Sequence, residues 1–308
     1  MNKNSGSPLR RFFLASLAAA ALFGGINGAS ADEGSGHFSW SWSFGNNTHF
    51  GNNGTRGSGV VKEETRAVAG FSKLVLALPA TVTLTQGGTE SLSISADDNL
   101  LPLMTTRVDG DELIIEGDRS RGFSTKNEIR IRLNVKSLSG ISIRGSGDVI
   151  GEQIKGDKLD IAIAGSGDVK LSSVRVDQFK IGIAGSGDVS IAALDSKSVD
   201  ASIRGSGDIR LPSVQATQVS ISVKGSGDVY AAGNTDKVDI EIMGSGDVRT
   251  RKLIAREAGV KVVASGDAEV HAKEKLTASV SGSGDIRYAG SPANISRSVK
   301  GSGSIEAL

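Results

Sequence analysis

The sequence predicts an all-β protein built as a parallel β-helix, a solenoid with coils of about 20 residues. Three observations lead to this prediction. A four-residue turn motif recurs at a fixed spacing, apolar residues alternate with polar or small ones between the motifs, and 41 glycines accompany only 4% aromatic residues. Large side chains fill an ordinary globular core, whereas the thin core of a solenoid is built from small and branched residues that repeat from coil to coil.

The motif is Gly-Ser-Gly-Asp, and successive copies begin 18 to 20 residues apart. A fixed period in this range indicates a solenoid, and the pattern of a leucine-rich repeat, which has a similar period, is absent. The copies are Gly145–Asp148, Gly165–Asp168, Gly185–Asp188, Gly205–Asp208, Gly225–Asp228, Gly244–Asp247 and Gly282–Asp285, with a near copy at Ala264–Asp267 and a last one without aspartate at Gly301–Ser304.

Between the motifs, apolar residues occupy every second position, as in Phe179, Ile181 and Ile183. This alternation is typical of strands with one face inward and the other toward solvent. Equivalent positions carry the same class of residue in each coil, so coils stacked about 4.8 Å apart would form continuous apolar columns. About eight coils are expected, and the last short one, from Gly301, would serve either as a cap or as an edge for a partner.

The β-helix domain is predicted to span 60–308, with regular coils from 145. Before the repeat, strands alternate with turns such as Gln86-Gly87-Gly88 and Asp109-Gly110-Asp111. The one short helical candidate, Asn99–Met104, is interrupted by Pro102.

Residues 1–31 are predicted to be an export signal, cleaved after Ala31. The segment has a basic start ending at Arg10 and Arg11, an apolar stretch from Phe12 to Phe23 and small residues before the cleavage site. The apolar stretch is too short for a bilayer core of about 30 Å. Both a twin-arginine signal and an ordinary secretory signal fit this pattern. We therefore expect an exported bacterial protein of the periplasm or cell surface.

Residues 32–59 form a low-complexity leader rich in glycine, asparagine and aromatic residues. Glycine and asparagine favour turns and linkers, so the segment reads as a flexible leader. The alternation from Phe38 to Phe44, which includes Trp40 and Trp42, would also suit one strand that binds a surface or pairs with the solenoid.

Composition excludes several classes of site. The chain has no cysteine, which rules out disulfides and thiolate metal sites. Its formal net charge is +1, from 35 basic and 34 acidic residues, which leaves no electrostatic footprint for nucleic acid.

The turn motif itself allows two interpretations. As a structural corner, its glycines would permit positive φ or close stacking of neighbouring backbones, and its aspartate would accept hydrogen bonds from backbone N–H groups. Alternatively, the stacked carboxylates would repel one another unless compensated by calcium, by backbone N–H groups or by the nearby Arg144, Arg204 and Lys224. The candidate calcium ligands are Asp148, Asp168, Asp188, Asp208, Asp228, Asp247, Asp267 and Asp285.

No catalytic constellation is visible in the sequence. An active site needs unique residues that break the repeat and converge, whereas these carboxylates occur once per coil. Two of the three histidines, His37 and His49, lie in the leader, and His271 stands alone. No nucleophile motif or phosphate-binding loop is present. We expect no catalytic residue and no cofactor other than the calcium considered above.

From about Arg66 to Leu308 the sequence resembles the auto-transporter adhesin head GIN domain family of bacterial envelope proteins. The matching features are Val68-Ala69-Gly70-Phe71, the Gln86-Gly87 turn, Asp97–Leu101 and the serial Gly-Ser-Gly-Asp coils. The resemblance implies a right-handed β-helix exposed in the periplasm or at the cell surface, and it defines no catalytic or ligand residues to carry over.

These observations predict a non-enzymatic envelope module for adhesion, binding or scaffolding, whose partner is an envelope polysaccharide or another envelope or cell-surface protein. A flat, mixed-charge face is expected to present Asp160, Lys180, Asp200, Ser202, Ser220 and Ser222. The alternatives are a calcium-stabilised structural β-helix and a polysaccharide-acting enzyme.

Overall fold

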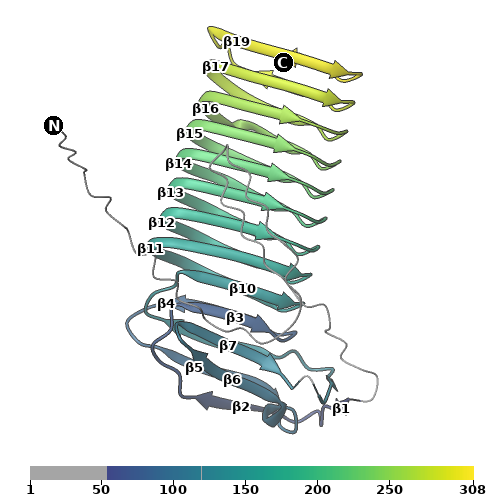
Figure 1. Cartoon of the computed structure of the whole chain (residues 1–308). Helices are drawn as coiled ribbons and strands as arrows, with labels where there is room; N and C mark the ends of the chain where they lie inside the picture. The colour runs from purple at the N-terminus through teal and green to yellow at the C-terminus, as the bar shows by residue number, and fades with distance from the viewer. Residues whose placement is uncertain (1–53, 119) are drawn as a thin grey trace, which may run out of the picture. The chain divides into compact units, whose positions relative to one another are not determined.

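The computed structural model describes residues 54–118 and 120–308, all of which belong to one compact unit. The export signal and most of the leader therefore lie outside the described residues. Strands stack in successive coils along the solenoid, as Figure 1 shows. The regular coils contain β10 (Gly140–Gly145), β11 (Asp148–Gly165), β12 (Val169–Ile183), β13 (Val189–Ile203), β14 (Ile209–Val223), β15 (Val229–Ile242), β16 (Val248–Val262) and β17 (Ala268–Gly282).

Each of these strands pairs in parallel with the next, and the register repeats the period of the sequence. Phe179 aligns with Val199, and Val199 aligns with Val219, so the apolar column predicted from the alternation is present. All three side chains are at most 2% exposed. The predicted all-β parallel β-helix, with about eight coils of about 20 residues, is confirmed.

The glycines of the turn motif are required by the close stacking of the corners. A Cβ atom built on Gly207 would lie 2.0 Å from the carbonyl oxygen of Gly187, and one built on Gly185 would lie 2.1 Å from that of Gly165. No side chain fits at such distances. Close stacking therefore explains the glycines throughout the column, while positive φ applies only to some of them, such as Gly145 and Gly165.

The region before the repeat is less regular. Here β3 pairs in parallel with β7 and β10, and β4 pairs in parallel with β9 and β11. Three further pairs are antiparallel: β5 with β9, β2 with β5, and β6 with β7. Its elements are β1 (Thr55–Arg56), β2 (Val61–Arg66), β3 (Lys73–Ala77), β4 (Thr81–Gln86), β5 (Ser91–Asp97), η1 (Leu101–Leu103), β6 (Met104–Asp109), β7 (Glu112–Gly117), β8 (Phe123–Ser124) and β9 (Arg130–Val135). The only helical element among the described residues is the 3-10 turn η1. It lies within the short helical candidate Asn99–Met104 and contains Pro102.

Three short strands follow the last long coil, and two of them form the terminal edge. They are β18 (Ile286–Ala289), β19 (Asn294–Gly301) and β20 (Ile305–Ala307). β19 pairs with β17 and β20 pairs with β18, both in parallel. All eight residues of β19 are exposed to solvent.

Candidate functional site

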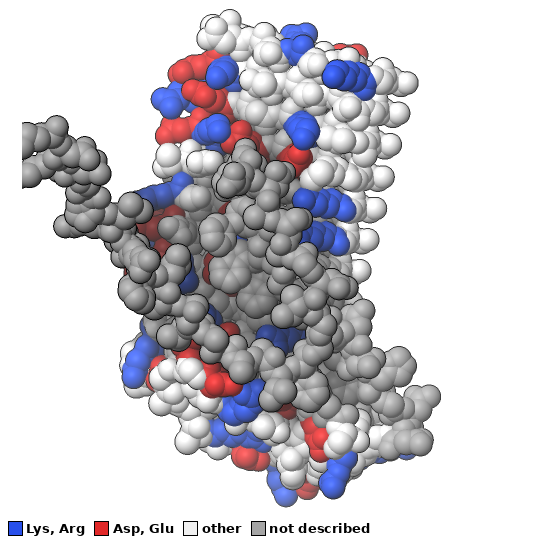
Figure 2. All heavy atoms as spheres, viewed as in Figure 1, with Lys and Arg blue, Asp and Glu red and all other residues white. Residues whose placement is uncertain are grey.

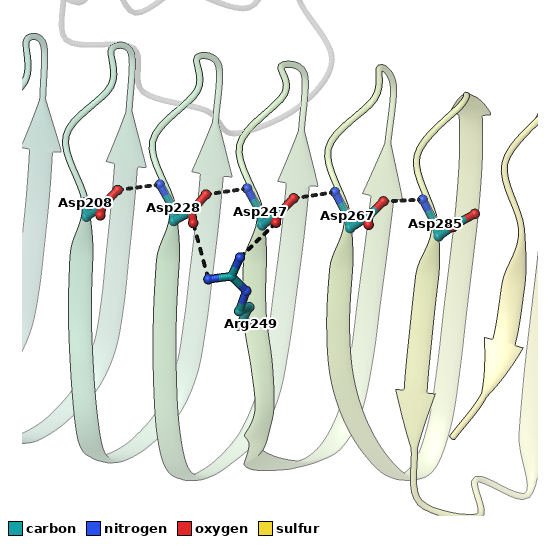
Figure 3. Close-up of polar contacts among 6 residues, drawn as sticks. All are labelled: Asp208, Asp228, Asp247, Arg249, Asp267 and Asp285. Atoms are coloured by element: carbon teal, nitrogen blue, oxygen red, sulfur yellow. Dashed lines mark hydrogen bonds and ion pairs between the residues drawn. The ribbon is translucent and has the colours of Figure 1, made fainter.

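The aspartates of the turn motif form one continuous column along the solenoid (Figure 3). In each coil the aspartate Oδ1 accepts a hydrogen bond from the backbone N–H of the equivalent aspartate in the next coil. The N···O distances are 2.8 Å from Asp228 to Asp208 and 2.9 Å from Asp247 to Asp228. The sequence predicted that each aspartate would accept a hydrogen bond from a backbone N–H of its own turn, but the donor N–H lies about one coil further along the chain.

The last copy of the motif supports a structural role for this carboxylate. Ser304, which stands where the other copies carry aspartate, donates its N–H to Asp285 Oδ1 at 2.8 Å. The backbone N–H at this position therefore bonds to the preceding coil as it does in the other copies, although the residue itself has no carboxylate.

Cations two residues beyond the aspartates compensate part of the stacked charge. Arg249 bridges two coils, with 3.3 Å to Asp228 Oδ2 and 3.0 Å to Asp247 Oδ2. Lys170 similarly lies 3.2 Å from Asp168. The candidates named from the sequence, Arg144, Arg204 and Lys224, make no ion pair with the column in the part of the chain that the structure describes.

Calcium binding by this column stays a prediction. Across residues 54–118 and 120–308, no group of three or more His, Asp or Glu side chains is arranged to hold a metal ion. The carboxylate oxygens retain lone pairs beyond the one used for the backbone bond. Each aspartate thus has a backbone partner and still has oxygen lone pairs that could bind a cation.

A groove runs along the side of the stack, away from the aspartate column. It has a volume of about 530 Å³ and crosses strands β11 to β15. Its floor is a column of small or branched residues, and polar residues before and after each floor residue form its two walls. The floor consists of Gly156, Val176, Ser196, Ala216 and Thr235. The first wall contains Arg175, Asp195, Gln215 and Asn234, and the second contains Asp177, Lys197, Thr217 and Asp236.

The floor hydroxyls are hydrogen-bonded to backbone carbonyl oxygens. Ser196 Oγ lies 3.1 Å from the carbonyl oxygen of Asp177 and 2.9 Å from that of Ser198, and Thr235 makes the equivalent bonds. Val176, Ser196, Ala216 and Thr235 are all between 4% and 7% exposed. Because these hydroxyls are already bonded to the backbone, the floor presents a narrow and largely apolar strip.

Each wall contains one ion pair between neighbouring coils. Arg175 Nε lies 3.0 Å from Asp195 Oδ2 on the first wall, and Lys197 Nζ lies 2.8 Å from Asp177 Oδ2 on the second. Further along, the walls carry the amides of Gln215 and Asn234. Figure 2 shows the same mixing of both signs of charge over the face in view. The groove therefore offers donors and acceptors in a repeating array, without a strong field of either sign.

Comparisons with known proteins agree with this architecture. The family model described as "Putative auto-transporter adhesin, head GIN domain" matches residues 70–193 and again 181–292. The chain belongs to this family. No curated protein matches it.

Solved structures show the same GIN-domain fold. A "putative lipid binding protein" from Parabacteroides distasonis is 26% identical, with a TM-score of 0.64 over 82% of this chain and 98% of that one. A "putative adhesin" from Parabacteroides merdae is 22% identical, with a TM-score of 0.65 over 83% of this chain and 99% of that one. The second likeness, at this level of identity, concerns the fold alone.

Other expectations for this GIN-domain protein fall on different parts of the structure. The predicted mixed-charge face is on β11 to β14, where Asp160, Lys180 and Asp200 align in register and Lys180 lies 3.8 Å from Asp200. His271 is on β17 and outside the groove, while His37 and His49 lie outside the described residues. No described helix has the length and hydropathy needed to cross a membrane.

Sequence reasoning missed the groove. The available signal was a polar residue, a small or branched residue and a second polar residue at the same place in successive coils, as in Asp195-Ser196-Lys197 and Gln215-Ala216-Thr217. Alternation alone identifies such residues as a strand, but it does not reveal that the surface is concave there.

Proposed function

We propose that this GIN-domain protein is an exported, non-enzymatic adhesion module of the bacterial envelope, and that it binds through the side groove. The groove carries this proposal because its polar walls continue over four coils. Such a surface can bind an extended partner through many weak contacts. Within the described part of the chain, the groove lining offers no group that stands apart from the repeat as a nucleophile or an acid–base pair would.

Membership of an adhesin-like family supports the proposal. One relative carries a lipid-binding name, but polar walls suit a hydroxylated partner better than an acyl chain. The periplasm or the cell surface is the proposed compartment, and the basic and apolar pattern of residues 1–31 supports export.

The test is binding of the mature chain, Asp32–Leu308, to whole bacterial cells and to isolated envelope fractions. We expect saturable binding without release of soluble fragments from the envelope. An absence of binding to every fraction would contradict the adhesion function, and release of glycan fragments that depends on the protein would contradict the non-enzymatic assignment.

A further inference from the structure

The chemistry of the groove identifies a class of ligand, provided that the groove is the binding surface proposed above. Its floor is an apolar strip because Ser196 and Thr235 direct their hydroxyls to the backbone. One wall carries cationic, carboxylate and amide groups, and the opposite wall carries carboxylate, cationic and hydroxyl groups. A sugar ring has the matching distribution, with C–H groups on its faces and hydroxyl groups around its edge.

The dimensions suit a chain rather than a single sugar. The floor runs through successive register partners from Gly156 to Thr235, which are four coil steps apart. At about 4.8 Å for each step, the floor is about 19 Å long. The wall positions repeat with the same step, so a polymer lying along the stack would meet polar groups at each coil.

Two other polymers fit less well. An extended peptide binds most readily by adding a strand to an open sheet edge, but β12, β13, β14 and β15 are paired on both sides where they cross the groove. A polyanion needs an excess of cations, whereas the described lining of the groove has two cations, Arg175 and Lys197, against three carboxylates, Asp177, Asp195 and Asp236. Both cations are also engaged in ion pairs.

We infer that the groove binds a neutral polysaccharide chain that lies parallel to the stack of coils. The floor packs against the C–H faces of successive sugars, and the wall amides of Gln215 and Asn234 exchange hydrogen bonds with their hydroxyl or acetamido groups. Among the residues that the structure describes, no aromatic side chain lines the groove, so we expect a single chain to bind weakly, with a Kd that is roughly millimolar. Many copies acting together on a cell would raise the apparent affinity.

The experiment titrates the mature chain with three hexasaccharides, using chemical-shift changes or calorimetry. The probes are cellohexaose and the hexamer of β-1,4-linked N-acetylglucosamine, which are neutral, and hexagalacturonate, which is anionic. We expect saturable binding of at least one neutral probe and weaker binding of the anionic one. Failure of both neutral probes, or tighter binding of hexagalacturonate, would overturn the inference.

A double variant tests whether the ligand binds in the groove. Gln215→Ala with Asn234→Ala removes two wall amides that make no hydrogen bond to another described residue. The loss of about two hydrogen bonds should weaken binding of the neutral probe about tenfold. The matched control, Gln178→Ala with Gln218→Ala, removes two exposed amides of β12 and β14 outside the groove lining and should leave the affinity unchanged. Thermal unfolding of both variants checks that the fold is retained.

The outcomes separate this inference from the proposed function. If the wild-type chain binds envelopes but the Gln215→Ala, Asn234→Ala variant binds them equally well, the ligand assignment is overturned and the adhesion function stands. If the wild-type chain binds no envelope fraction, the proposed function itself fails. Equal weakening by the control variant would also overturn the placement of the ligand in the groove.

Discussion

At its N-terminal end the described solenoid is closed by antiparallel strands, whereas at its C-terminal end the parallel stack simply stops at β19 and β20. The same kind of apolar column runs toward both ends. The N-terminal column is covered by strands with no counterpart in the repeat, while the C-terminal one is covered only by a last, shorter coil. The difference shows how an irregular sequence can protect one end of a regular structure.

Specific polar contacts hold the N-terminal end together. Asp97, only 1% exposed, accepts hydrogen bonds from Thr125 Oγ1 at 2.6 Å and from Asn127 Nδ2 at 2.5 Å. Arg66 of the edge strand β2 donates to the carbonyl oxygens of Met104 and Leu101, at 2.5 and 2.9 Å. These bonds join β2 and β5 to segments far away in the sequence.

The C-terminal end has fewer such contacts. Ile295 and Val299, which continue the inward columns, are 44% and 47% exposed. Arg297 lies over the ring of Tyr288, with its guanidinium carbon 4.8 Å from the ring centroid, and donates to the Tyr288 hydroxyl. Among the described residues, no strand pairs with the outer side of β19. The last coil was expected to be either a cap or an edge for a partner. In the structure it covers the preceding coil, and its own outer edge is unpaired among the described residues.

The largest expected contrast comes from one inward column. Leu276 is 0% exposed and aligns with Ile295 in the terminal coil. Leu276→Ala should lower the free energy of unfolding by about 2–5 kcal/mol, because it leaves a cavity between stacked coils. Ile295→Ala should cost less than about 1 kcal/mol, since almost half of that side chain is already in solvent. Chemical denaturation of both variants tests the contrast, and equal losses would show that the terminal coil is as tightly packed as the interior.

The corner glycines should show the same contrast on a smaller scale. A Cβ atom would lie 2.0 Å from the preceding corner's carbonyl oxygen at both Gly207 and Gly303. Gly207→Ala should cost about 3 kcal/mol, because coils on both sides hold the backbone in place. Gly303→Ala should cost clearly less, because the terminal coil can shift outward. A Gly303→Ala loss as large as that of Gly207→Ala would mean that the C-terminal edge is held as rigidly as the middle.

The regular coils were predictable from the sequence because one period determines spacing, register and corner chemistry together. The antiparallel closure at residues 61–135 was not, since those strands share no repeat and their pairing depends on distant contacts such as Arg66 with Met104. The aspartate column was predicted as a column. Backbone N–H donors were predicted for these aspartates, but their position in the next coil was not, because rules for local turns look two residues ahead rather than one coil ahead.

Each single aspartate of the column should contribute moderately to the free energy of unfolding. Asp208→Ala removes the acceptor for the Asp228 N–H and should cost about 1 kcal/mol. Asp208→Asn keeps an acceptor oxygen and relieves repulsion between stacked carboxylates, so we expect a change within about 0.5 kcal/mol.

Thermal unfolding with calcium and with chelator decides whether this column also binds a cation. The hydrogen bonds alone predict equal melting temperatures in both conditions. A rise in melting temperature with calcium that disappears in the Asp208→Asn variant would instead establish the calcium-stabilised alternative.

The smallest expected contrast is in the pH dependence of stability: acid should destabilise the N-terminal end before the regular coils. Hydrogen bonds from Thr125 and Asn127 lower the pKa of Asp97, and the Ser58 hydroxyl and Lys62 lower the pKa of Asp98. A carboxyl group whose pKa is lower in the folded state stabilises the fold above its unfolded pKa of about 3.9, and this contribution is lost as the pH falls through the folded value. Asp97→Asn should therefore make stability less dependent on pH below about 4. Hydrogen exchange measured between neutral pH and acid should show β2 and β5 opening before β12 to β15, and simultaneous opening would contradict the assignment of acid sensitivity to this end.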